Sequence, residues 1–163
     1  MKYLLLIYGN QDAVLTDPGM TEDQARRLGD WVAAKDRNVT DIFITHGHGD
    51  HFFAAGLLAE RFGARVVATD GTIAQMHGSV ATRPLLWDKL YPGLIPPSPV
   101  TAVTVPDNRV TLEGHDLVMV DVGHADAAAR ISPAGCQTTI MSSLAGHWSM
   151  RDVRVGRPGA HGR

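Results

Sequence analysis

The sequence THGHGDH, residues 45–51, directly follows the short apolar run DIFI at residues 41–44. It places three imidazoles and one carboxylate within six residues. Neutral imidazole and carboxylate are ligands that zinc takes in proteins. The two glycines leave the backbone free to fold these ligands around an ion without Cβ clashes. A solvated surface loop has no reason to concentrate groups that repel one another when protonated, so the segment predicts a metal site.

The segments around this loop predict an α/β domain. Apolar runs bounded by turn residues indicate strands at residues 3–8, 13–16, 41–45, 65–68, 101–105, 109–112 and 116–122. Helical spacing of apolar residues indicates helices at residues 21–35, 51–62 and 72–76. The first helix opens with the capping-box pattern Thr21 to Gln24, and the second should stop at Gly63. The metal loop follows a strand, and ligand sites gather at the carboxyl ends of strands in α/β sheets.

The loop resembles the T-H-x-H-x-D-H signature of the metallo-β-lactamase superfamily, a group of mostly zinc-dependent hydrolases. Upstream, AVLTDPG at residues 13–19 is similar to the family's strand whose aspartate, here Asp17, supports the ligand loop. Downstream, LVMVDVGH at residues 117–124 is similar to the strand that delivers a third histidine, here His124. The matches fall in the family's order over about residues 3–124. The resemblance implies an α/β fold of the αββα sandwich type.

The same resemblance implies a set of roles. His46, His48 and His124 would bind one zinc ion, whereas Asp50 and His51 would begin a second site beside it. A zinc held by three histidines keeps a position open for water and lowers the pKa of that water from 15.7 to about 7. Asp50 is the implied catalytic residue, because it can orient the nucleophile or carry its proton. We expect a hydrolase, with one or two Zn²⁺ ions, acting on an ester, thioester, lactone, lactam or phosphoester bond of a small molecule.

The second metal site departs from the family pattern. Members normally supply a bridging aspartate about twenty residues after the third histidine, but only Asp126 and Asp152 follow His124 here, and neither ends an apolar strand. His147, Asp152 or a partner chain would have to complete the site. The alternative function is therefore a truncated, non-catalytic metal-binding remnant that associates through exposed sheet surface.

The character of the chain changes after the third motif. Residues 1–124 form the expected core, whereas residues 125–163 contain five arginines and no lysine or glutamate. We expect this divergent tail to be disordered or loosely attached. The sandwich should be truncated at both ends and incomplete in its second half. Because an open sheet edge invites pairing with another chain, a homo-oligomer is also expected.

Composition limits the partners and the compartment. The 163 residues carry a net charge of −2, which gives no reason to expect nucleic acid or an anionic membrane as a partner. The apolar runs are too short to span a bilayer. The single cysteine, Cys136, cannot form an internal disulfide, which fits the reducing cytoplasm. Trp87, Tyr91 and the proline-rich loop at residues 91–99 would either line a substrate pocket or simply pack the loop.

Overall fold

The computed structural model describes residues 3–121, 129–133 and 149–154, with side chains from residue 6 to residue 120. In the described part of the chain, five strands form one sheet in the order β4-β3-β2-β1-β8. These strands are β1 (Tyr3–Tyr8), β2 (Asp12–Thr16), β3 (Asn38–Phe43), β4 (Arg65–Val67) and β8 (Ser149–Arg154). Strands β2, β3 and β4 are parallel to one another, and β1 is antiparallel to β2.

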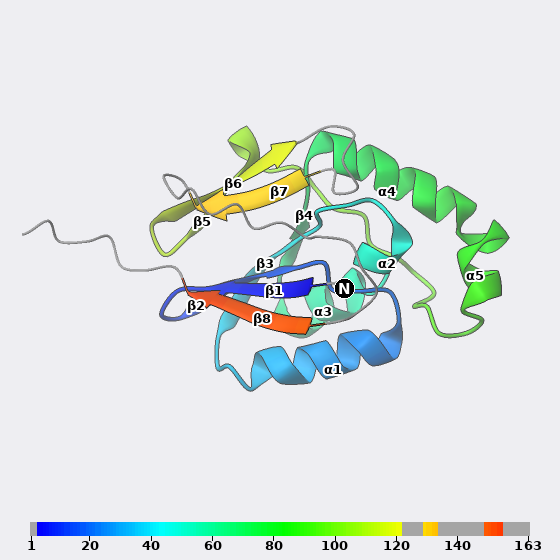
Figure 1. Ribbon diagram of the computed structural model, residues 1–163, viewed down its shortest axis with the longest axis horizontal. Coiled ribbons are helices and arrows are strands. Elements are labelled where there is room, and N and C mark those ends of the chain that lie inside the picture. Colours follow the sequence, from blue (N-terminus) through cyan, green and yellow to red (C-terminus); the bar gives the residue numbers. More distant parts are fainter. Residues whose placement is uncertain (1–2, 122–128, 134–148, 155–163) are drawn as a thin grey trace, which may run out of the picture.

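A second, antiparallel sheet lies against the first, as Figure 1 shows. It consists of β5 (Arg109–Leu112), β6 (His115–Asp121) and β7 (Ala129–Pro133). The helices are α1 (Glu22–Ala33), α2 (Gly49–Phe52), α3 (Ala55–Phe62), α4 (Asp70–Thr82) and α5 (Trp87–Leu90), with 3₁₀ turns at Arg83–Leu85 (η1) and Pro106–Asn108 (η2). None of these helices is long and apolar enough to cross a membrane.

Successive side chains of the central strands face opposite sides of the first sheet, and each side packs into its own hydrophobic core. Leu6, Leu15 and Ile42 pack with buried residues of α1 and α3 on the helical face of the first sheet. The neighbouring residues Ile7 and Phe43 point the other way and pack with residues of the second sheet. Successive side chains of a strand face opposite sides, so each central strand serves both cores. Helix, sheet and sheet form three successive layers, which confirms the predicted α/β sandwich.

Several predicted elements are confirmed in detail. The capping box at the start of α1 is present: the Thr21 hydroxyl accepts from the Gln24 N–H at 3.3 Å, and the Gln24 side-chain oxygen accepts from the Thr21 N–H at 3.0 Å. Helix α3 ends at Gly63, which has the left-handed φ of 67° that favours glycine. Helix α4 differs from the predicted residues 72–76, because the Thr69 hydroxyl caps an earlier start and the helix continues to Thr82.

Two predicted elements are wrong. The helix expected over residues 51–62 is interrupted between α2 and α3, because the Ala54 N–H donates to the Gly19 carbonyl at 3.0 Å and leaves the helical ladder. The strand expected at residues 101–105 is absent from the described structure except for one isolated bridge between Val103 and Val67.

The C-terminal region contains strands that were not predicted. Strand β8 pairs in parallel with β1, and β7 pairs with β6. The expectation of disorder therefore does not hold for residues 129–133, whose backbone pairs with β6, or for residues 149–154, whose backbone pairs with the open edge of β1. The rest of the stretch to residue 163 lies outside the described residues. The boundary at residues 124 and 125 stays a prediction.

Candidate metal centre

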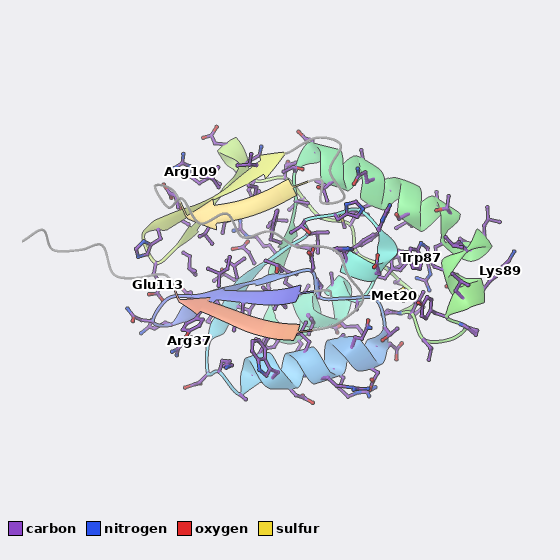
Figure 2. All side chains as sticks on the ribbon, viewed as in Figure 1. Met20, Arg37, Trp87, Lys89, Arg109 and Glu113 are labelled. Carbon is purple, nitrogen blue, oxygen red and sulfur yellow. The ribbon has the colours of Figure 1, made fainter. Side chains whose placement is uncertain are left out.

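The histidine loop lies where three parallel strands end. Asp17 follows β2, the loop at residues 44–51 follows β3, and Thr69 follows β4. Because these strands are parallel, their carboxyl ends meet at one edge of the sheet, as predicted. Figure 2 labels Met20 and Trp87 near this edge, and Glu113 and Arg37 at the opposite end of the strands. We call the edge at the carboxyl ends of β2, β3 and β4 the ligand edge.

Asp17 holds the start of the ligand loop. Its Oδ1 accepts from the Thr45 N–H at 2.9 Å, and its Oδ2 accepts from the Thr45 hydroxyl at 2.5 Å. The Nδ1 atom of His51 lies 3.2 Å from the same Oδ2. Asp17 is only 4% exposed and has a left-handed φ of 45°. A buried carboxylate needs such partners to offset its lost hydration, so these contacts fix both Asp17 and the loop. The supporting role predicted for Asp17 is confirmed.

Three imidazoles of the loop lie close together. The ring centres of His46 and His48 are 4.0 Å apart, and those of His46 and His51 are 5.2 Å apart. Two imidazoles on one tetrahedral zinc have ring centres roughly 5 Å apart, because each Zn–N bond is about 2.1 Å. His46 is buried and His51 half-buried, whereas His48 is exposed. The donor chemistry of these rings fits metal ligation. The separation of His46 and His51 is close to the zinc-bound value, whereas the rings of His46 and His48 lie closer together.

The described residues hold only part of the predicted ligand set. His124, which is the predicted third ligand of the first site, and His147 lie outside the described residues, as does the side chain of Asp152. Asp50 follows the histidine pair in the first turn of α2 and is half-buried. Within the part of the chain that is described, no three His, Cys, Asp or Glu side chains form a ready-made metal site. The full ligand set and the completion of the second site stay predictions.

The two glycines of the loop are needed for space. A Cβ atom on Gly47 would lie 2.3 Å from the Cβ of Gln75, and one on Gly49 would lie 2.1 Å from a ring carbon of Phe53. Neither glycine has a positive φ. The predicted need to avoid Cβ clashes is therefore seen at both glycines, and the clashes would occur with α4 and with the Phe53 ring.

Sequence reasoning missed two residues that contact this loop from α4. The Ser79 hydroxyl donates to the Gly47 carbonyl at 2.6 Å, and the Gly47 N–H donates to the Gln75 side-chain oxygen at 3.4 Å. Residues four apart share one face of a helix. The four-residue spacing of Gln75 and Ser79 could have predicted that both face the loop. It could not be used, because the predicted helix ends at Met76, before Ser79.

The aromatic residues beyond α4 pack against the core. Trp87 meets Phe53 edge-on at 5.9 Å between ring centres, and Tyr91 stacks on Trp87 at 6.4 Å. Arg83 donates to the Pro96 carbonyl at 2.6 Å and pairs with Asp88 at 2.8 Å. These contacts favour loop packing over the pocket-wall alternative for Trp87 and Tyr91.

Comparisons with known proteins agree with this architecture. The family model described as the metallo-beta-lactamase superfamily matches residues 3–132 of the chain. A search of curated proteins found no match. Solved structures with a similar fold include a metallo-β-lactamase with a HARLDQ motif from Cronobacter sakazakii, with 26% identity, a TM-score of 0.54, and 77% of this chain and 50% of that chain covered.

Two further structures extend the comparison. ETHE1 from Myxococcus xanthus has 26% identity and a TM-score of 0.50, with 78% of this chain and 47% of that chain covered. The metallo-β-lactamase MIM-1 from Novosphingobium pentaromativorans has 21% identity and a TM-score of 0.57, with 77% and 47% covered. The present chain therefore spans about half the length of these structures.

Proposed function

Because this chain belongs to the metallo-β-lactamase superfamily, we propose that it is a zinc-dependent hydrolase whose histidine loop holds the metal. The observation that carries the proposal is the meeting of three imidazoles at the ligand edge. The His46 ring lies beside both His48 and His51, and the buried Asp17 holds the loop that carries them. Imidazoles repel one another when they are protonated, so three of them close together beside a buried carboxylate support a role in ligand binding.

The proposed roles follow the resemblance of the loop to the histidine motif of the family. His46, His48 and His124 would hold one zinc ion, and Asp50 and His51 would contribute to a second. When bound, zinc lowers the pKa of a water molecule from 15.7 to about 7 and so supplies hydroxide at neutral pH. Asp50 would orient that nucleophile or carry its proton away. The exposed ring of His48 marks the side of the loop that solvent and substrate can reach.

The bond that is cleaved is proposed only as a class. Hydroxide of this kind attacks a carbonyl or phosphoryl centre, so the candidates are ester, thioester, lactone, lactam and phosphoester bonds of a small molecule. Two of the similar structures are named metallo-β-lactamases, which supports including the lactam.

A second candidate is a non-catalytic metal-binding protein. The observation that favours it is that only Asp126 and Asp152 are available as carboxylates after His124, and neither ends an apolar strand. In this case the chain would hold metal without turning over substrate. Exposed Val120, on the outer face of β6, fits association through sheet surface.

Native mass spectrometry of the full chain after zinc reconstitution tests both candidates, combined with hydrolysis of lactam, lactone, ester and phosphodiester substrates. We expect one or two zinc ions per folded chain, and turnover that His48→Ala abolishes. His77→Ala is the matched control, because His77 is exposed on α4. Turnover that survives His48→Ala would contradict the zinc mechanism. Bound zinc without turnover would select the second candidate.

A further inference from the structure

Gly47 is the single residue between His46 and His48, so its position sets how the two imidazoles lie relative to each other. It is buried, and the ring centres that it separates are only 4.0 Å apart. A small rotation of the Gly47 peptide would swing both rings. Whatever fixes that peptide therefore also fixes the geometry of the histidine pair.

Helix α4 contacts this peptide directly. The Ser79 hydroxyl donates to the Gly47 carbonyl at 2.6 Å, which is a short distance for a hydroxyl donor. The Gly47 N–H donates to Gln75 at 3.4 Å, which is long and correspondingly weak. A Cβ on Gly47 would also lie 2.7 Å from the backbone nitrogen of Met76, so the helix backbone itself lies against Gly47. Ser79 is the stronger of the two polar contacts.

The helix that carries Ser79 is well anchored. It is 13 residues long, begins at the capping hydroxyl of Thr69, and buries Met76 completely in the helical core. Met76 and Ser79 are three positions apart and therefore lie on neighbouring parts of one helix face. A group carried by such an element positions its partner more accurately than one carried by a loop.

We propose that Ser79 is a positioning residue that, with Gln75, sets the geometry of the histidine pair through the Gly47 peptide. This inference rests on the proposed metal-binding function. The loop is then held on both sides of His46: by Asp17 at Thr45, and by Ser79 at Gly47. Partners that orient metal ligands in this way commonly change metal affinity by about 10–100-fold when they are removed.

Two measurements on the full chain test the role of Ser79. Zinc affinity is measured by competition with a chromophoric chelator for wild type, Ser79→Ala, Ser79→Thr and Thr82→Ala. Thr82 is the matched control, because its hydroxyl donates to carbonyls of its own helix, that of Gly78 at 3.0 Å and that of Ser79 at 3.4 Å, rather than to the loop. We expect Ser79→Ala to lose about tenfold in affinity, while Ser79→Thr and Thr82→Ala stay close to wild type.

The second measurement does not depend on metal. Amide hydrogen exchange of the metal-free chain should be faster over residues 45–50 in Ser79→Ala than in wild type or Thr82→Ala. Equal affinity and equal exchange in Ser79→Ala and wild type would overturn the inference, as would equal losses in Ser79→Ala and Thr82→Ala. If the wild-type chain binds no zinc, the proposed function fails, and the exchange experiment alone decides whether Ser79 holds the loop.

Discussion

Asp17 and Glu113 both hold a neighbouring segment by accepting backbone hydrogen bonds, and they lie at opposite ends of the strands. Both have a left-handed backbone, with φ of 45° and 49°. Asp17 is buried at the ligand edge, where it binds Thr45 and lies beside His51. Glu113 is exposed at the turn between β5 and β6, and we call the region around it the turn end.

Glu113 ties the two sheets together at the turn end. Its carboxylate accepts from the N–H groups of Asn10, Gln11 and Asp12 at 2.8, 2.5 and 2.8 Å, in the turn after β1 and at the first residue of β2. Successive N–H groups of this kind form a concavity that suits an anion. Hydrogen bonds from Asn10, then Asp12 and Gln11, lower the pKa of Glu113 from 4.5 to about 2.

Asp17 and Glu113 use the same kind of contact, a carboxylate that accepts backbone hydrogen bonds, with different consequences. At the turn end, the groups that Glu113 binds are backbone N–H groups of a hairpin, so the contact acts on the stability of the fold. At the ligand edge, the carboxylate of Asp17 also touches the side chains of Thr45 and His51. Loss of Asp17 should therefore disturb both stability and the histidine cluster, whereas loss of Glu113 should affect stability alone.

The largest effect is expected at the ligand edge. Asp17→Ala removes a buried acceptor from the Thr45 N–H and hydroxyl, so it should lower the free energy of unfolding by about 3 kcal/mol. Urea denaturation measures this change, and zinc titration should show weaker binding in the same variant. Glu113→Ala is the comparison, and it should bind zinc as wild type does. Equal loss of zinc binding in the two variants would remove the contrast between the two ends.

A steric change at the ligand edge should be the next largest. Gly49→Ala places a Cβ 2.1 Å from the ring of Phe53, which itself packs against Phe52 at 4.8 Å and Trp87 at 5.9 Å between ring centres. Because that ring has little freedom to move, overpacking should cost about 2 kcal/mol. Thermal unfolding measures the loss. A variant as stable as wild type would show that the ligand edge tolerates an added methyl group.

The turn end should respond to pH. The pKa of Glu113 is depressed in the folded chain, so its contribution to stability is fully present above about pH 4.5 and is lost as the pH falls toward 2. Glu113→Gln should therefore be less stable than wild type at pH 6, and the difference should shrink steadily toward pH 2. Melting temperatures of both proteins across this range give the comparison. A difference that does not change with pH would mean that the ionised carboxylate contributes nothing.

The smallest change in stability is expected at a residue that belongs to neither the ligand edge nor the turn end. Gly78 lies inside α4, and a Cβ at this position would meet nothing within 4 Å. Gly78→Ala should raise the free energy of unfolding by about 0.5–1 kcal/mol, because alanine favours the helix. Urea denaturation should resolve this gain. A loss of stability instead would show that Gly78 has a packing role. Gly78→Ala could then no longer serve as the unstrained glycine-to-alanine control for Gly49→Ala.

The sequence predicts those parts of the site that lie within one continuous motif. The histidines and Asp50 are neighbours in THGHGDH, and Asp17 stands in a strand-ending pattern that resembles a known family. Ser79 and Glu113 could not be predicted in the same way. Each contacts backbone atoms of a distant segment, and neither contact changes the periodicity of the strand or helix that carries it. The break at Ala54 was missed for the same reason, because its cause is a hydrogen bond to Gly19.

The contacts that shape the ligand loop also differ from the turn-end contacts in the length of chain that they close. Thr45 to Asp17 spans 28 residues and Ser79 to Gly47 spans 32, whereas the Glu113 contacts span 101 to 103. Closing the shorter loops costs about 1 kcal/mol less in chain entropy. During synthesis from the N-terminus, the contacts of the histidine loop are available to form before the hairpin that carries Glu113 has been made. The ligand loop thus belongs to the part of the chain that can assemble first, and the tie between the two sheets at Glu113 closes later.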